Sequence, residues 1–459
     1  MSRPVQASLT RLEEIAGAAR VVTEPGALEA REVDGARPAA VVQPAETSQI
    51  ADLLRFAAEE KLAVIPYGGG TKLGIGAPPE RYDLAVDLSR MNRVLAYDPD
   101  DLTLSVEPGI RVAELLRILG EKRQMLPLAA PFAEHATIGG IVAANSTSPL
   151  RHAYGGIRDF CLGMEFVTGD ATVAKSGGRV VKNVTGYDLH KVLIGSRGTL
   201  AVITRINFRT FPVLPFQGTF VATFFEAGPA LAFGRAIAQS VLSPRSVDIL
   251  GPGAARMLSR AEDPVEFAEE RWSAVVTAAG EPAVVDRHAR DLGHMARTAQ
   301  ADEFKSFAGV EEASLIGRIR EFPRLVLESL PDALIFRING LPTAMPPLLA
   351  GLRDLAAKSK LSLAPLIHVS GIVYAAIFGE EEGAVSPAVF PAVAAQVFQL
   401  CAGPEIGAQA TLEWAPAEVK RAAGGILGPP RRDLSLMKRL KDVFDPQRVL
   451  SPGRFGWGI

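Results

Sequence analysis

Apolar residues in the first 215 positions recur with helix and strand periods, separated by Gly-rich turns. Residues 48–60 are predicted to be helical because Ile50, Leu53 and Leu54 share one face. A second helix is expected at 112–120. Many short strands with few helices favour an α+β fold over a doubly wound parallel sheet. The expected strands are 40–42, 62–66, 84–88, 94–97, 102–106, 163–168, 171–174 (a hairpin with the preceding run) and 199–210.

The hydrophobic pattern changes in residues 216–415, where apolar runs alternate with longer amphipathic segments. This pattern predicts an antiparallel sheet of about four strands covered by helices. The expected strands are 219–225, 274–278, 333–339 and 367–377, and the expected helices are 229–242, 282–299, 345–358 and 389–402. The tail, 416–459, is polar and helical up to residue 444.

Composition narrows the classes of function. The chain has 459 residues, of which 48% are hydrophobic and 22% charged, as in ordinary globular proteins. A net charge of −2 lacks the basic surplus of a nucleic-acid binder. Two distant cysteines, Cys161 and Cys401, argue against a disulfide scaffold, an iron–sulfur cluster or a Cys-rich zinc site, and we expect both to be buried.

Two charge-free windows, 361–379 and 383–404, contain prolines and polar residues and lack the dense Leu, Ile and Phe content of a bilayer helix. The first residues show no apolar core of a secretory signal. We therefore expect a cytoplasmic protein without a transmembrane segment. Attachment to a membrane through a complex stays open.

The loop Pro66-Tyr67-Gly68-Gly69-Gly70-Thr71-Lys72-Leu73-Gly74 follows an apolar strand. Consecutive glycines let several backbone N–H groups converge on one anion, which is the chemistry of a diphosphate cradle. A Gly-rich hairpin turn is the alternative. The loop has neither the Walker A nor the Rossmann spacing, so a nucleotide here implies another fold.

Two later segments carry similar signals. In Thr137-Ile138-Gly139-Gly140-Ile141-Val142-Ala143-Ala144-Asn145, small residues leave one face bare, against which either a flat ring or a close helix fits. The strand at 201–204 is preceded by two glycine-containing segments, residues 177–189 and Gly195-Ser196-Arg197-Gly198-Thr199-Leu200. The ordered series of glycine-punctuated segments is hard to explain as a set of unrelated turns.

Together these segments resemble the FAD-binding domain of the vanillyl-alcohol oxidase / p-cresol methylhydroxylase superfamily. Lys182-Asn183-Val184-Thr185-Gly186-Tyr187-Asp188 and residues 195–200 are similar to the glycolate oxidase branch, and within it to the FAD-binding subunits. The likeness returns at Phe444-Asp445-Pro446 and Ser451-Pro452-Gly453-Arg454. It implies a PCMH-type FAD-binding domain (1–215, joined by the tail 416–459) followed by a cap or substrate domain of antiparallel sheet and helices (216–415).

The resemblance also implies site residues. Backbone N–H groups of residues 68–73 would hold the FAD diphosphate, and the backbone of Val202 or Ile203 would meet the adenine. Gly70 stands where covalent members carry a histidine, so FAD would bind non-covalently. The expected cofactor-binding residues are Tyr67, Gly68, Gly69, Gly70, Thr71, Lys72, Leu73, Pro131, Thr137, Ile138, Gly139, Gly140, Asn145, Val202 and Ile203.

The substrate half departs from the related 2-hydroxy-acid dehydrogenases, whose two histidine motifs hold a divalent metal. His368 keeps the first histidine of one motif, and Trp414 replaces the histidine of the other, so we expect no active-site metal. His368 is either a satisfied core histidine or a base against the flavin. Arg337, a charge in an apolar run, either clamps a substrate carboxylate or pairs with an acidic residue on a neighbouring helix.

Two principal functions follow from the resemblance. In the first, the chain oxidises a small, glycolate-like 2-hydroxy acid, and electrons pass through FAD to a partner. In the second, it is an FAD-binding electron-transfer or structural subunit beside a sister flavoprotein that does the chemistry. The expected partners are that sister subunit and an iron–sulfur subunit, and a cofactor-free scaffold is a third possibility. Substrate, electron acceptor and stoichiometry stay open.

Overall fold

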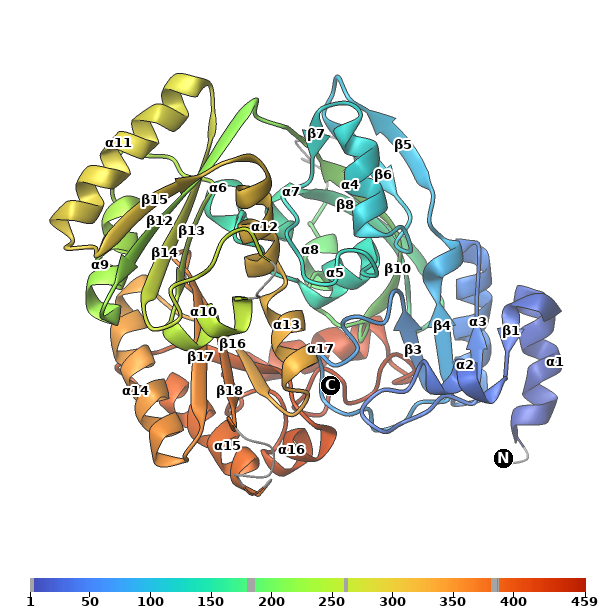
Figure 1. Ribbon diagram of the computed structural model, residues 1–459. Coiled ribbons are helices and arrows are strands. Elements are labelled where there is room, and N and C mark those ends of the chain that lie inside the picture. The colour runs from blue at the N-terminus through green and yellow to red at the C-terminus, as the bar shows by residue number, and fades with distance from the viewer. Residues whose placement is uncertain (1–3, 180–185, 260–262, 381–385, 387) are drawn as a thin grey trace.

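The computed structural model describes residues 4–179, 186–259, 263–380, 386 and 388–459, and shows two units side by side (Figure 1). The segment 182–185 of one sequence motif lies outside the described residues. Among those described, no helix combines the length and apolarity needed to cross a membrane.

The first unit begins with a small sheet in the order β1-β2-β4-β3. Strands β2 (Ala40–Val42) and β3 (Val64–Tyr67) run parallel to β4 (Leu84–Asp87), and β1 (Val21–Val22) is antiparallel to β2. Helix α3 (Thr47–Glu59) buries the predicted apolar face against this sheet. The first helices are α1 (Pro4–Ala16) and α2 (Pro25–Glu29).

A second, antiparallel sheet completes the first unit in the order β5-β6-β10-β8-β9. The predicted hairpin forms, with Val167 opposite Val173. The strands are β5 (Val94–Asp98), β6 (Thr103–Val106), β8 (Cys161–Thr168), β9 (Val173–Gly177) and β10 (Ala201–Arg209); the helices are α4 (Val112–Gly120), α5 (Ile138–Ala144), α6 (Arg151–Tyr154), α7 (Ile157–Phe160) and α8 (His190–Leu193). The short strands β7 (Gln124–Met125) and β11 (Phe211–Pro212) pair beside it. The α+β fold is confirmed.

The second unit is one antiparallel sheet in the order β15-β12-β14-β13-β17-β18-β16-β19, about twice as wide as the sequence predicts. Its strands are β12 (Phe216–Phe224), β13 (Ser246–Leu250), β14 (Trp272–Gly280), β15 (Glu303–Phe307), β16 (Leu334–Asn339), β17 (Ser362–His368), β18 (Ile372–Phe378) and β19 (Gln409–Trp414).

Helices cover both faces of this wide sheet. Alternate side chains contribute to two cores, because neighbouring residues of a strand point to opposite faces. The outer face packs against α9 (Ala227–Ala238), α11 (Pro282–Thr298), α14 (Met345–Lys358) and α15 (Val389–Ala402) (Figure 1). The other face packs against α10 (Pro252–Leu258), α12 (Gly309–Arg320) and α13 (Phe322–Ser329), and also against Ile75 and Ala144 of the first unit.

The prediction of one strand at 367–377 is wrong. The chain reverses there, since Gly371 has φ +96° and its N–H donates to the carbonyl of His368 at 3.0 Å. Strands β17 and β18 form a hairpin, with His368 opposite Ile372. An apolar run that continues through both strands concealed the turn.

The tail returns from the second unit to the first through α16 (Ala417–Ala422) and α17 (Leu434–Phe444). Val64 N–H donates to Val449 O and Ser451 N–H to Val64 O, both at 2.8 Å, so the tail extends the edge of the first sheet. The Lys441 ammonium is fully buried and donates to Asp445 Oδ2 at 2.6 Å and to Thr199 O at 2.7 Å.

Replacing Lys441 by Met should lower the free energy of unfolding by about 3–5 kcal/mol, because Asp445 would remain as a buried charge without its cation. Urea unfolding measures the change. Lys438→Met, on an exposed position of the same helix, is the control and should stay near the wild-type value. Equal stability of the two variants would contradict the role given to the pair.

Candidate functional site

A groove of about 830 Å³, partly open to solvent, runs between the loop after β3 and helix α5. The far wall comes from the start of β10, and the tail closes one end with Arg454. The lining residues are Ile65–Leu73 as a continuous run, then Ile75, Leu88, Pro108, Thr137, Gly139, Gly140, Ala143, Ala144, Arg197, Gly198, Ala201, Ile203 and Arg454.

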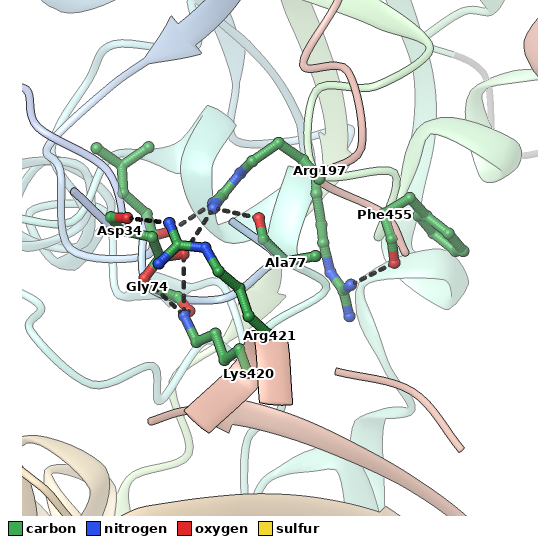
Figure 2. Close-up of polar contacts among 9 residues, drawn as sticks. Asp34, Gly74, Ala77, Arg197, Lys420, Arg421 and Phe455 are labelled. Atoms are coloured by element: carbon green, nitrogen blue, oxygen red, sulfur yellow. Dashed lines mark hydrogen bonds and ion pairs between the residues drawn. The ribbon is translucent and has the colours of Figure 1, made fainter. Parts of the chain in front are cut away.

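The loop presents its backbone N–H groups and has its carbonyls engaged elsewhere. The N–H groups of residues 68–72 donate to no acceptor among the residues that the structure describes. On the carbonyl side, Lys420 Nζ donates to Gly74 O at 2.8 Å and Arg454 Nη1 to Ala77 O at 2.9 Å (Figure 2). A row of free amides in a groove is a site for an anion such as a diphosphate.

The glycines of the loop are required by close packing against the neighbouring segment. A Cβ on Gly69 would lie 1.8 Å from His135 O, and one on Gly68 would lie 2.2 Å from Thr137 Oγ1. Gly70 has φ +75°, which disfavours other residues. The loop predicted from the sequence lines the groove, and its glycines let it approach the 135–137 backbone.

Helix α5 supplies the bare wall of the groove. Thr137 caps it, accepting from Gly140 N–H at 3.4 Å. A Cβ on Gly139 would lie 2.6 Å from Pro108 Cβ, so this glycine serves close packing, whereas a Cβ on Gly140 would meet only Thr137 Oγ1 at 3.3 Å. The close packing at Gly139 is therefore against Pro108, which belongs to no helix, and the face at Gly140 is open toward the groove.

Positive charge gathers where the groove meets the second unit. Lys72 lies in the groove wall, donates to Pro131 O at 2.9 Å, and sits 4.9 Å from the centre of the Phe132 ring. Burial lowers the pKa of Lys72 to about 8. Burial also lowers the pKa of Arg197 to about 10, and the nearby charge of Arg337 adds to this shift.

Arg337 extends from β16 to the C-terminal end of α5, near the groove residue Arg197. Its Nη1 lies 3.1 Å from Glu413 Oε1 on the adjacent strand β19 and donates to Asn145 O at 3.0 Å. The predicted ion pair exists, but its partner is on a strand, not a helix. Burial lowers the pKa of Arg337, but the charge of Glu413 and a hydrogen bond with Tyr374 outweigh burial and raise it.

The ion pair between Arg337 and Glu413 is close but poorly aligned. The 3.1 Å between Arg337 Nη1 and Glu413 Oε1 is short enough for an ion pair, but the two groups are not oriented for a hydrogen bond. Glu413 Oε1 therefore lacks a hydrogen-bond partner among the described residues, and so does Arg337 Nε. Ser146 Oγ and Thr147 Oγ1, just after α5, are buried and unpartnered in the same sense. Such atoms mark a place where a polar ligand or water completes the bonding.

His368 lies outside the groove. Its Nδ1 is 2.6 Å from Asp248 Oδ1 on the neighbouring strand β13, and the ring is buried. The ring lines a small separate pocket, with room for about one water molecule, together with Pro131, Thr147 and Tyr374. No cluster of three or more His, Cys, Asp or Glu residues suited to a metal ion occurs among the positions described.

The structure gathers most of the predicted cofactor residues along the groove: Tyr67, Gly68, Gly69, Gly70, Thr71, Lys72, Leu73, Thr137, Gly139, Gly140 and Ile203. The side chains of Ile138 and Val202 point into the cores. Asn145 ends α5, and Pro131 contributes its carbonyl to Lys72.

Sequence reasoning missed the cations and acids around the groove, namely Arg197, Arg454, Glu413 and Tyr374. Arg197 and Arg454 belong to two of the sequence motifs, but those motifs were interpreted from their glycines and not from their arginines. Cys161 and Cys401 are buried free thiols, as expected.

Comparison with known proteins agrees with this geometry. A family model of the FAD binding domain matches residues 38–177, and one of the C-terminal domain of FAD linked oxidases matches residues 430–455. These two segments supply most of the groove and its closing arginine. They identify FAD as the cofactor and the chain as an FAD-linked oxidoreductase.

Several relatives act on 2-hydroxy acids by name. The glycolate oxidase subunit GlcD of Bacillus subtilis is 24% identical over 422 residues, covering 91% of this chain and 88% of that protein. The D-lactate dehydrogenase of Archaeoglobus fulgidus is 34% identical over 172 residues, 38% of each chain. Among solved structures, p-cresol methylhydroxylase with substrate bound has TM-score 0.77 at 16% identity, covering 99% of this chain and 98% of that one, which shows a shared fold.

Gly69→Ala should abolish retention of FAD, because the new methyl group would displace the loop from His135 O and disorder its amides. The measurement is the flavin-to-protein absorbance ratio after desalting. Gly120→Ala, at the exposed end of α4, adds a methyl group into open space and serves as the control, which should retain FAD. A Gly69→Ala protein as yellow as the wild type would place the cradle elsewhere.

FAD affinity should fall as pH rises through 8, and Lys72→Met should remove this dependence. An anionic ligand stabilises the ammonium form, so it raises the pKa of Lys72 above the value of about 8 in the free protein. Binding is then strongest below pH 8 and weakens as the free protein loses that proton. Fluorescence titration with FAD from pH 6.5 to 9.5 measures the effect, and a flat wild-type profile would contradict it.

Proposed function

We propose that this FAD-linked oxidoreductase oxidises a small 2-hydroxy acid whose carboxylate binds between Arg197 and Arg337. The observation that carries the proposal is an imbalance of charge: Arg337 pairs with Glu413, whereas Arg197, which lines the groove, forms no ion pair among the residues that the structure describes. Buried charge is costly unless it is paired. An incoming carboxylate would supply the missing negative charge and accept the fork of an arginine.

The groove residues would hold the cofactor. In this arrangement the amides of residues 68–72 bind the diphosphate, the bare face of α5 lies along one side, and the start of β10 meets the adenine. No cysteine or histidine lines the groove among the described residues, which supports non-covalent binding. FAD, when bound, supplies the acceptor for the hydride that leaves the α-carbon of the substrate.

His368 is the candidate base for the substrate hydroxyl. When Nδ1 carries a proton and donates to Asp248, Nε2 is the ring atom left to accept one. The cavity that His368 lines also contains Pro131, whose carbonyl binds the groove residue Lys72, and Tyr374, which bonds Arg337. The pocket beside His368 is therefore connected to Lys72 through Pro131 and to Arg337 through Tyr374.

The alternative is an FAD-binding electron-transfer or structural subunit without substrate chemistry of its own. The separation of His368 from the groove favours it, because the ring is buried and occupied by Asp248. In either case electrons leave to a partner. We propose a sister flavoprotein subunit and an iron–sulfur subunit, since this chain has only two cysteines, both buried, and a relative is named as a subunit.

Anaerobic addition of glycolate or D-lactate to the purified protein should bleach the visible flavin band, whereas lactamide, which lacks the carboxylate, should not. Arg337→Lys keeps a cation beside Glu413 but loses the fork, so half-maximal reduction should require about tenfold more acid, with flavin content unchanged. Arg353→Lys, at an exposed position, is the matched control.

Equal responses to the acid and the amide would overturn the carboxylate site. A flavin that stays oxidised with every acid, but is reduced once the sister subunit is added, would support the alternative function.

A further inference from the structure

Asp34, a charged residue in a tight turn of the first unit, has no role in the site proposed above. Residues 33–36 form a two-residue hairpin turn, in which Val33 N–H donates to Ala36 O at 2.8 Å and Ala36 N–H to Val33 O at 2.9 Å. Asp34 and Gly35 have φ +51° and +85°, as a type I′ Asp-Gly turn requires. Val33 is buried beneath the turn, which directs the Asp34 side chain toward the tail.

Three cations of the tail, Lys420, Arg421 and Arg454, converge on this single residue, and Figure 2 shows the first two beside it. Lys420 Nζ donates to both carboxylate oxygens of Asp34, at 2.9 and 3.1 Å, and Arg454 Nη1 lies 3.3 Å from Oδ2. Arg421 Nη2 donates to the backbone carbonyl of Asp34 at 2.9 Å. The Lys420 and Arg454 side chains are 1% and 3% exposed, so Asp34 is the counter-charge that lets both remain buried.

The same two cations hold the cofactor loop. Lys420 donates to Gly74 O, and Arg454 donates to Ala77 O and to Leu73 O. Within the loop itself few bonds fix its shape: Ile75 N–H donates to Lys72 O at 3.0 Å, and Leu73 N–H to Gly70 O only at 3.4 Å. The conformation that exposes the amides of residues 68–72 therefore depends on contacts from the tail.

We propose that Asp34 is a positioning residue for FAD: it fixes Lys420 and Arg454 on the carbonyl side of the loop, so that the loop amides face the groove. Asp34 does not line the groove and acts through the tail. Because a positioned tail favours FAD, bound FAD must in turn favour the docked tail. The inference rests on FAD binding in the groove but is independent of the substrate.

The test is FAD affinity of the apoprotein in the Asp34→Asn variant. Asn-Gly favours the same turn, so this change removes the charge and leaves the backbone conformation. The Kd for FAD should rise about ten- to a hundredfold, the range that matches the loss of one charge-assisted hydrogen bond. Asp433→Asn, which removes an exposed ion pair of the tail far from the loop, is the control and should keep the wild-type Kd.

A second measurement separates positioning from mere stability. Limited trypsin digestion should cleave near Arg421 more slowly when FAD is bound to the wild type, and FAD should lose this protection in Asp34→Asn. Asp34→Glu should restore most of the affinity and the protection. If Asp34→Asn fails to fold, Lys420→Met is measured in its place, since it removes one of the two cations that Asp34 fixes against the loop.

A Kd within twofold of the wild type in the folded variants, with only the melting temperature lowered, would overturn the inference and leave Asp34 a structural residue. That result would leave the proposed substrate untouched, because no substrate enters the experiment. Loss of FAD binding in the Asp433→Asn control as well would also overturn it, since the effect would not belong to Asp34.

Discussion

The site depends on keeping the backbone N–H groups of one loop free of acceptors inside the protein. Free amides are costly unless a ligand or water bonds them, and a loop left alone would turn them toward its own carbonyls. Here the carbonyls of Leu73, Gly74 and Ala77 accept hydrogen bonds from Lys420 and Arg454 of the tail. These carbonyls are therefore not available as acceptors for the loop amides. The glycines at 68 and 69 then allow the loop to lie against the 135–137 segment, which holds it from the other side.

The second unit contributes charge more than shape to the groove. Its wide sheet is packed with helices on both faces, and the face toward the first unit carries Arg337, Tyr374 and Glu413. These strands fix Arg337 and Glu413 in position beside Arg197, which lines the groove. Because Arg337 and Glu413 balance each other, the excess positive charge at this end of the groove comes from Arg197.

Local patterns predicted most of the elements, and long-range contacts account for what they missed. The helices 345–358 and 389–402 match α14 and α15 because each has an amphipathic repeat of its own. The hairpin inside 367–377 escaped because both strands and their turn are similarly apolar. The loop at 66–74 was recognisable from its glycines, but Arg197, Glu413 and Arg454 become part of the site only when segments more than 200 residues apart meet.

The edge formed by Val449 and Ser451 on β3 has a consequence for how the protein is made. The strand that leads into the cofactor loop is separated in sequence from this neighbour, and from the arginine that closes the groove, by the whole second unit. The ribosome therefore synthesises the second unit before the first unit can acquire its last strand edge and the closing arginine of its groove.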